Sequence, residues 1–406
     1  MKDHSFFRSA INVGALALLL VSVGCSGDLD PVSSLGEQTK MMAPVAKRAA
    51  PVVPGRYIVV LEDGVSAADV PGRARGLARK HGGQEEQIYR HALKGFAARG
   101  LSQSAAARLR DEPGVKIVEQ DRVWTLNKRG GGKGPGGGGG GGGCQTQTVP
   151  WGIARVGGVS DGSSLTGTAW IIDTGISGVS DLNLNTEKSA NFVTKGKNSS
   201  NDGNGHGTHV AGTVAAKDNG CDVVGVAAGA EVAAVRVLDN RGSGYTSWIV
   251  AGIDYVAANG VAGDVANMSL GGYSGTSETA MDVAVKQAAD QGILFAIAAG
   301  NSAEDASYYT PAHIENKVGV YTVSAIGTND CLASFSNYGS PVDVAAPGVG
   351  VESLAKDGGT VTYSGTSMAA PHVAGLLLLG LLGSDGTACG DPDGNPDLIA
   401  DRKSVV

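Results

Sequence analysis

Residues 363–375 read YSGTSMAAPHVAG, and this stretch places Ser367 among small residues at the expected start of a helix. A serine hydroxyl is a poor nucleophile until a base takes its proton, so it needs exposure, an imidazole partner and donors for the oxyanion. Gly365 and Ala369 leave room for a substrate backbone, and a helix start aims free N–H groups at the same place. Gly-Thr-Ser alone would also fit an ordinary N-capping serine. The rest of the chain must therefore supply the partners.

Two stretches upstream supply candidates. Residues 169–176 read as a buried parallel strand that ends in Asp173 and a glycine turn, and residues 203–213 read as a Gly-rich loop that runs into a helix with His206. Together with residues 363–375, they resemble the motifs of the subtilisin-like serine peptidases residue by residue. Their chain order, Asp, His, Ser, is the subtilisin order and differs from that of chymotrypsin and the α/β-hydrolases. The details are most similar to the proteinase K and aqualysin branch.

This resemblance implies acyl transfer to a serine, then hydrolysis, on polypeptide substrates and with no cofactor for catalysis. Ser367 would be the nucleophile, His206 the general base, and Asp173 the group that holds the imidazole tautomer. Asn301 follows a buried strand expected at 294–299, where a lone Asn would be a routine turn residue. It matches the family's oxyanion Asn, and the backbone N–H of Ser367 would be the second donor.

A metal site is the alternative for the Gly-rich motif, because His206 and His209 are three residues apart and could share a helical face. No Glu stands beside them as in the zinc peptidase helix. The resemblance makes His206 catalytic and His209 structural.

Substrates are expected to bind by β-augmentation, in which an extended peptide pairs with exposed edge strands. Small apolar walls at the primary pocket suggest a broad, mainly hydrophobic or aromatic preference. The matched stretches contain no acid that would favour a narrow processing peptidase for basic sites. The matched cleft and pocket residues are Gly242, Ser243, Gly244, Ser269, Leu270, Gly271, Ala298, Ala299 and Gly300.

A catalytically dead relative used only for binding is a further alternative. Dead homologues usually lose a triad member or the oxyanion Asn, whereas Asp173, His206, Asn301 and Ser367 are all present. The sequence therefore favours an active peptidase.

Structural calcium is common in the branch that the chain resembles. Asp343 matches a calcium-ligating Asp, whose other ligands would be backbone carbonyls near Val318 and Val320; a solvated or capping Asp is the alternative. Residues 391–397 place oxygen ligands at every second position, like half of a calcium loop. Pro396 replaces the turn Gly and no closing Glu follows, so an exposed acidic turn is expected there.

Composition describes a globular protein with room for two or three domains. The 406 residues are 42% hydrophobic and only 17% charged, with 64 Gly and a net charge of −7. Mild acidity suits solubility and argues against nucleic acid as a partner. We expect a monomer.

The N-terminus predicts export from a bacterial cell. Residues 1–24 read as a signal peptide with a short apolar run at 11–23. Cys25 follows as in a lipoprotein processing site, which would give a lipid-anchored protein; ordinary cleavage would give a secreted one. Residues 25–54 read as a flexible tether. Outside the cell disulfides can form, and the other cysteines, Cys144, Cys221, Cys331 and Cys389, allow two bridges with three possible pairings.

Residues 55–127 read as a small α+β domain of order β-α-β-β-α-β. Strands are expected at 56–61, 87–93, 95–99 and 115–121, and helices at 70–81 and 101–112. The domain resembles the inhibitory propeptides of the family; an unrelated ferredoxin-like domain is the alternative. Residues 123–127 would lie along 242–244 and 269–271 as a product-like strand, with a first cut between Leu126 and Gly130. Residues 128–143 read as a Gly-rich flexible linker.

Residues 144–406 alternate strands and helices, so a doubly wound parallel-sheet α/β fold is expected. Continuous apolar runs predict strands covered on both faces. The expected strands are 169–173, 231–238, 265–270, 294–299 and 321–326, and the expected helices are 206–216, 246–258, 276–291 and 367–382.

Overall fold

The computed structural model describes residues 49–126, 129–132, 144–196 and 198–402. The predicted signal peptide, Cys25, and most of the predicted tether and Gly-rich linker lie outside these residues. Within them, no helix is both long and apolar enough to cross a membrane.

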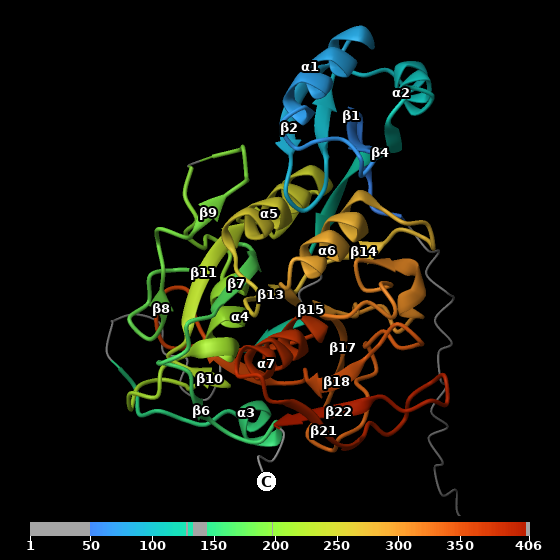
Figure 1. The fold of residues 1–406 in the computed structure, drawn as a ribbon. Coiled ribbons are helices and arrows are strands. Elements are labelled where there is room, and N and C mark those ends of the chain that lie inside the picture. The colour runs from blue at the N-terminus through green and yellow to red at the C-terminus, as the bar shows by residue number, and fades with distance from the viewer. Residues whose placement is uncertain (1–48, 127–128, 133–143, 197, 403–406) are drawn as a thin grey trace, which may run out of the picture. The chain divides into compact units, whose positions relative to one another are not determined.

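The N-terminal domain has the expected β-α-β-β-α-β order (Figure 1). Strands β4, β1, β3 and β2 are neighbours in that order, and all their pairings are antiparallel. One face packs on the helices around Val59, Phe96 and Leu109, which are fully buried. The elements are β1 (Val52–Leu61), α1 (Val70–Lys80), β2 (Gln84–Tyr89), β3 (Gly95–Arg99), α2 (Gln103–Arg110) and β4 (Val115–Thr125).

Several boundaries in this domain differ from the prediction, in β1, β2, α2 and β4. β1 begins at Val52 rather than 56, because Val52 pairs with Arg122 and so belongs to the strand, not to a tether. The strand predicted at 87–93 is only partly right: β2 runs from Gln84 to Tyr89 and forms the predicted hairpin with β3. The backbone N–H groups of residues 90–92 turn instead toward the carboxylate of Asp254, which accepts all three.

The second part of the chain is built on a ten-stranded sheet, which confirms the predicted doubly wound α/β fold (Figure 1). All its pairings are parallel except the β21–β22 edge. In spatial order the strands are β21 (Leu382–Thr387), β22 (Leu398–Arg402), β18 (Val344–Pro347), β17 (Val320–Ile326), β15 (Leu294–Ala298), β13 (Val265–Met268), β7 (Thr168–Asp173), β11 (Glu231–Arg236) and β8 (Asn183–Leu184), with β9 (Ala190–Asn191) also paired to β11.

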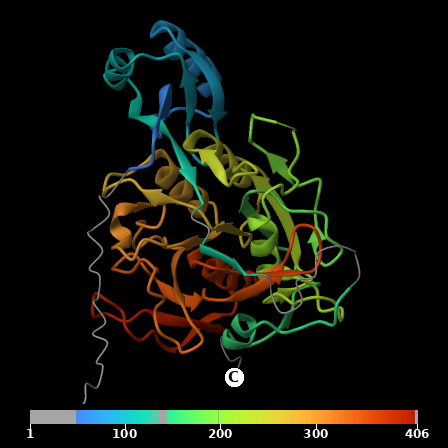
Figure 2. The same cartoon turned by 180° about the vertical axis from the view of Figure 1, so that it is seen from behind.

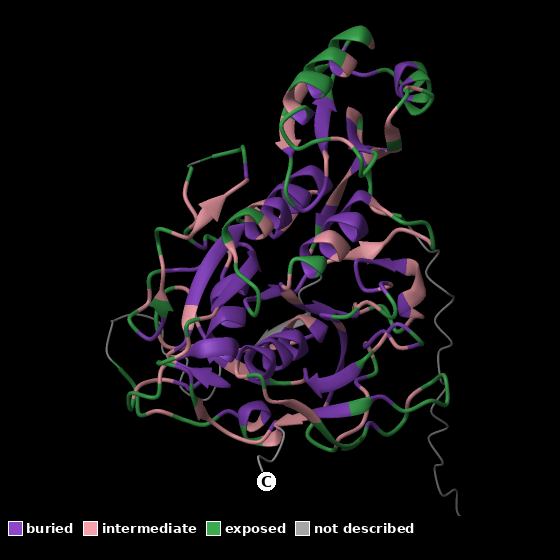
Figure 3. Ribbon diagram, viewed as in Figure 1, coloured by how far each residue is buried: buried purple, intermediate pink, exposed green. Residues whose placement is uncertain are grey.

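Helices cover both faces of this sheet, so the central strands are buried throughout (Figure 3). In β7, Ile171 packs in the cluster with helices α4 (His206–Ala215) and α7 (Thr366–Leu378). Its neighbour Trp170 faces the other way, into the cluster with α5 (Thr246–Asn259) and α6 (Ala280–Asp290). Because successive side chains of a strand point to opposite faces, apolar residues at every position produce this two-sided core.

The ends of two predicted helices are wrong. α6 begins at Ala280 rather than 276, because Thr279 and Asp282 form a capping box that fixes the start. α7 ends at Leu378 rather than 382, and Leu382 already opens β21, the edge strand. An apolar run alone does not tell a buried helix from a helix followed by a strand.

The short elements surround the sheet (Figure 2). They are β5 (Arg129–Gly132), α3 (Trp151–Arg155), β6 (Ser160–Asp161), β10 (Ala227–Ala228), β12 (Ser243–Tyr245), β14 (Gly272–Tyr273), the 3-10 turn Ala306–Tyr308, β16 (Tyr309–Thr310), β19 (Val351–Leu354) and β20 (Thr360–Ser364). β5 lies in the predicted flexible linker, yet these four residues pair with β20, so that part of the prediction is wrong.

Two disulfides select one of the three possible pairings. Cys144 is bonded to Cys221, and Cys331 is bonded to Cys389. The first ties the start of the second domain to the loop after α4, and the second holds the C-terminal hairpin.

Candidate active site

Asp173 and His206 are brought together at the carboxyl ends of the strands. Asp173 ends β7 and is fully buried, and its Oδ1 and Oδ2 lie 2.8 and 2.9 Å from His206 Nδ1. Two carboxylate oxygens facing one ring nitrogen require a proton on Nδ1. In the neutral ring, Nε2 is then the free acceptor.

The loop before α4 is organised by Asp202, which is buried. Its Oδ2 accepts the backbone N–H and the hydroxyl of Thr208, and its Oδ1 accepts the backbone N–H of Gly205. At Gly207 a Cβ atom would lie 2.1 Å from the carbonyl oxygen of Gly175. Only glycine permits this approach of the helix start to the loop that follows Asp173.

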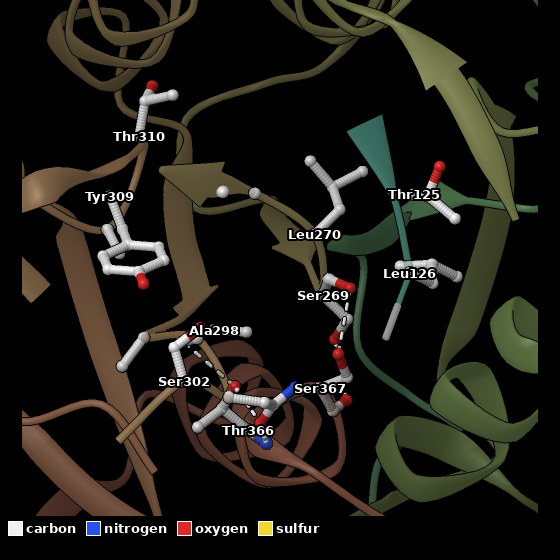
Figure 4. A pocket seen from close by; sticks show the side chains of 16 residues that line it. Thr125, Leu126, Ser269, Leu270, Ala298, Ser302, Tyr309, Thr310, Thr366 and Ser367 are labelled. Carbon is white, nitrogen blue, oxygen red and sulfur yellow. Dashed lines mark hydrogen bonds between the residues drawn. The ribbon is translucent and has the colours of Figure 1, made fainter. Parts of the chain in front are cut away.

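Ser367 lies in the first turn of α7, opposite Ser269 (Figure 4). Its Oγ donates to the carbonyl oxygen of Ser269 at 3.1 Å, and Ser269 Oγ donates to the carbonyl oxygen of Ser367 at 2.8 Å. In the described residues no hydrogen bond joins Ser367 to His206. Contacts of this kind are often incomplete before substrate binds.

Asn301 follows β15 and has a fixed amide orientation. Its Oδ1 accepts the backbone N–H of Thr366 at 2.8 Å and the Thr366 hydroxyl at 3.0 Å. A backbone N–H can only donate, so the amide oxygen must face Thr366 and the amide nitrogen is left as the available donor. The Ser367 N–H, in the first turn of α7, has no partner within the helix.

The two other histidines near these motifs are buried and neutral. Burial lowers the pKa of His209 to about 3 and that of His372 to about 4. His209 Nε2 lies 3.0 Å from the carbonyl oxygen of Val351, and its ring stacks on Tyr363. His209 thus joins α4 to β19, as a structural residue would.

A pocket opens beside Ser367 (Figure 4). The predicted residues Ser269, Leu270, Gly271, Ala298, Ala299 and Gly300 all line it, together with Asn301. The sequence did not predict that Ser302, Tyr309, Thr310 and Ala312 line it as well. Tyr309 and Thr310 form the short strand β16, and no strand or helix pattern in the sequence marks this segment.

The predicted edge at 242–244 is occupied by the N-terminal domain. β4 pairs antiparallel with β12, with Thr125 opposite Ser243 and Trp124 opposite Gly244. The Leu126 N–H donates to the carbonyl oxygen of Gly242 at 2.9 Å. Residues 269–271, the other predicted edge, have no backbone pairing with β4 in the described chain, although Thr125 and Leu126 line the same pocket.

Farther along the chain, β5 pairs antiparallel with β20, which leads into α7. Arg129 is opposite Ser364, three residues before Ser367, and Gly132 is opposite Thr362. The described segments that end at Leu126 and begin at Arg129 therefore flank the serine motif from both sides.

Two carboxylates of β4 bind the starts of α5 and α6. Asp121 accepts the backbone N–H of Ser247 at 3.0 Å and its hydroxyl at 2.7 Å, and Glu119 accepts the backbone N–H of Ala280 at 2.8 Å. Helix starts favour negative charge. Burial raises the pKa of Glu119 to about 7.

Trp124, also on β4, fills an apolar site in the second domain. It is 4% exposed, its Nε1 donates to Thr246 Oγ1 at 2.9 Å, and a Cβ atom at Gly272 would lie 2.7 Å from its ring. No local sequence pattern predicts this site, because its walls come from separate segments.

The residues proposed for calcium are only partly brought together. Asp343 lies beside β17, where its Oδ2 accepts the Thr322 N–H at 2.8 Å. Val320 is in the same strand, whereas the Val318 side chain is 92% exposed. Residues 391–397 form a hydrogen-bonded acidic turn, but the expectation that it is exposed fails at Asp397, which is buried and accepts the Ser324 hydroxyl at 2.6 Å. No group of three or more His, Cys, Asp or Glu side chains in the described residues is arranged to hold a metal.

Asp181 is an acid that the sequence did not single out. It is 3% exposed, and burial raises its pKa to about 6. Its Oδ1 accepts Asn219 Nδ2 at 2.8 Å, whereas its buried Oδ2 has no hydrogen-bond partner. In the same loop, Gln147 Oε1 accepts the Asn219 N–H at 3.0 Å, and Asn219 Oδ1 accepts the Cys221 N–H at 2.9 Å.

Comparison with known proteins agrees with these features. Residues 170–382 match the subtilase family model, and residues 56–127 match the peptidase inhibitor I9 model. Alkaline serine exoprotease A of Vibrio alginolyticus is 41% identical in a match that covers 73% of this chain. The same match covers 53%, about half, of that relative's own length. Proteinase R of Parengyodontium album is 35% identical over 85% of this chain and 84% of its own.

A solved structure, of a cold adapted subtilisin-like serine proteinase, has a TM-score of 0.54 and 35% identity, and the match covers 63% of this chain and 98% of that one. The chain therefore belongs to the subtilase family, as a subtilisin-like serine endopeptidase with an I9 inhibitor domain as its propeptide.

Proposed function

We propose that this peptidase cleaves polypeptides through an acyl-enzyme on Ser367. His206 Nε2 takes the serine proton and returns it to the leaving amine, while Asp173 holds the Nδ1–H tautomer and stabilises the imidazolium. The observation that carries this proposal is the Asp173–His206 pair at 2.8 Å, together with Ser367 in the first turn of α7. The mechanism requires the Ser367 hydroxyl, which donates to the Ser269 carbonyl oxygen in this structure, to turn to the imidazole when substrate binds.

The oxyanion is proposed to bind Asn301 Nδ2 and the Ser367 N–H. The Thr366 N–H fixes the Asn301 amide with its nitrogen free. Such a preorganised donor needs no reorientation as charge develops, and one donor is worth about 10²–10³ in kcat.

Substrates are proposed to pair with Gly242, Ser243 and Gly244 and to place a side chain in the pocket beside Ser367. The pairing of β4 with β12 supports this mode, because it shows that the edge accepts an extended strand. Walls made by Ala298, Ala299 and Gly300 suit apolar side chains, so we propose a broad specificity with a hydrophobic preference.

The enzyme is proposed to be made as a zymogen that processes itself. Residues 55–127 would act as the inhibitor, docked through Trp124, the two helix starts and the Asp254 carboxylate. Thr125–Leu126 and β5 flank the serine motif, so the scissile bond would lie in the short interval between Leu126 and Gly130.

Maturation tests this proposal. Purified precursor is expected to release a fragment that ends between Leu126 and Gly130, read by mass spectrometry and N-terminal sequencing. The isolated 49–127 fragment, added in excess, should then inhibit hydrolysis of a small peptide. A first cut upstream of Trp124, or undiminished hydrolysis with the fragment present, would contradict the docking register.

Export from a bacterial cell is proposed from residues 1–24, with either lipidation at Cys25 or release as a secreted protein. The two disulfides support an oxidising location. We propose that the mature enzyme acts as a monomer.

Structural calcium is also proposed. Asp343 has an Oδ1 without a hydrogen bond in the described residues, and the backbone carbonyls of Val318 and Val320 would complete its oxygen donors. Asp181 is the better candidate, because its buried Oδ2 accepts no hydrogen bond among the described residues, and Asn219 links its Oδ1 to the amide oxygen of Gln147. An oxygen-only donor set suits Ca²⁺.

Chelation is therefore expected to lower thermal stability. A ligand at 100 times its Kd adds about 2.7 kcal/mol, which corresponds to roughly 5–10 °C in Tm for a domain of this size. The inactive Ser367→Ala protein, which cannot digest itself, would be melted with calcium and with EDTA, and compared with the same protein carrying Asp181→Asn. EDTA should shift the first and have a much smaller effect on the second. An equal EDTA-induced change in Tm in both proteins would show that Asp181 does not bind calcium.

A further inference from the structure

The primary pocket ends in a polar pair that the apolar walls do not explain. Tyr309, on β16, lines the pocket opposite Leu126 and is 8% exposed (Figure 4). Its hydroxyl donates to Glu304 Oε2 at 2.6 Å. Burial, together with the hydrogen bond to Glu304, raises the pKa of Tyr309 above its ordinary value. The hydroxyl end of the ring points toward Ser302, another lining residue.

The pair is held rigidly. β14 and β16 place Tyr273 opposite Tyr309, and the Tyr273 ring meets the Tyr309 ring edge-on with centroids 5.7 Å apart. The Glu304 N–H donates to Asn337 Oδ1, and its carbonyl oxygen accepts the Tyr338 N–H. The carboxylate thus comes from a segment fixed independently of substrate.

Glu304 is a negative charge without a compensating cation. Among the described residues no Lys or Arg lies within ion-pair distance of it, and Oε1 accepts no hydrogen bond. The Tyr309 hydroxyl has one proton, which goes to Glu304, so its oxygen can otherwise only accept, and the Ser302 hydroxyl is one of its partners. The end of the pocket therefore presents the Tyr309 and Ser302 oxygens as acceptors, with the Glu304 carboxylate behind them.

We propose that Tyr309 and Glu304 are specificity-determining residues. They allow the pocket to bind substrate side chains that end in a hydrogen-bond donor, such as those of Lys and Gln, in addition to apolar side chains. This rests on the function proposed above and deepens it. A site built to hydrogen-bond a donor discriminates against the isostere that lacks one. A cation gains further from the carboxylate, since charges interact strongly in a partly desolvated pocket.

A first cut directly after Asn127, within the interval proposed above, would fit this selection. Leu126 is held by Gly242 and Arg129 lies opposite Ser364. The next residue after Leu126, outside the described chain, is Asn127, whose amide carries two donor protons. The residue that follows Leu126 is therefore polar, not apolar.

Peptides that differ only at the residue before the cut test the proposal. Succinyl-Ala-Ala-Pro-X-p-nitroanilides with X as norleucine, Lys or Gln have side chains of similar length. The mature wild-type enzyme is expected to cleave all three. Glu304→Gln should lower the Lys-to-norleucine ratio of kcat/KM about tenfold and leave norleucine within twofold. Tyr309→Phe should lower the Gln-to-norleucine ratio about threefold or more.

Glu315→Gln is the matched control, because it removes an exposed carboxylate from the same segment outside the pocket lining. Its ratios should equal those of the wild type. Both ratios within twofold of wild type in Glu304→Gln and Tyr309→Phe would overturn the proposal. Should Glu304→Gln lose all activity, the Tyr309→Phe ratio decides alone. A wild-type enzyme that cleaves none of the peptides would instead contradict the proposed function.

Discussion

Replacing Ser367 by Ala is expected to lower kcat by about a millionfold, because the acyl-enzyme can no longer form and only the oxyanion donors and substrate binding remain. The Ser367 hydroxyl lies in the first turn of α7, and Ser367 lines the pocket that Leu126 also lines. The precursor should remain uncleaved, since the same serine would process it. Mass spectrometry of the purified protein and hydrolysis of a small peptide measure the two effects.

The control for this substitution is Ser384→Ala, which removes an exposed hydroxyl from β21. It should process and hydrolyse like the wild type. A Ser367→Ala protein that still matures in a host without other proteases would refute the nucleophile assignment.

Replacing Asp173 by Asn is expected to lower kcat by about ten-thousandfold with little change in KM. The Asp173 carboxylate now requires a proton on His206 Nδ1, which leaves Nε2 free to accept the serine proton. An amide at this position can donate to Nδ1, which stabilises the opposite tautomer and places a proton on Nε2. The geometry would be kept while the base is lost.

The Asp173→Asn precursor can be matured by a trace of wild-type enzyme, and kcat and KM are then measured after that trace is accounted for. Asp357→Asn, which removes an exposed carboxylate on the β19–β20 turn, is the control for loss of charge. A loss in kcat below tenfold would show that Asp173 does not set the tautomer.

Much of the peptidase fold could be predicted because its signals are local. The apolar run that ends at Asp173 and the glycines around His206 are contiguous in sequence, and the structure confirms a strand and a helix start there. The two residues are in contact because the carboxyl end of β7 adjoins the start of α4. Because the carboxyl ends of parallel strands lie at one edge of the sheet, sequence patterns that end there predict that such residues come close together.

Features that depend on distant contacts could not be predicted. Asp254 binds backbone groups more than 160 residues away in the chain, and nothing near it indicates that partner. In the sequence, Glu304 and Asp181 are indistinguishable from surface acids. Only the fold brings the Tyr309 hydroxyl to Glu304 and buries the Asp181 carboxylate. The run of glycines that contains β5 has no side-chain pattern at all, so its pairing with β20 comes only from the neighbouring edge.

The most direct test of the account is covalent labelling of the mature enzyme with a fluorophosphonate, followed by peptide mapping. The account predicts one adduct per molecule, on Ser367, and its suppression by excess 49–127 fragment. An adduct on another residue, or an active enzyme with no adduct, would contradict the assignment of Ser367 as the nucleophile.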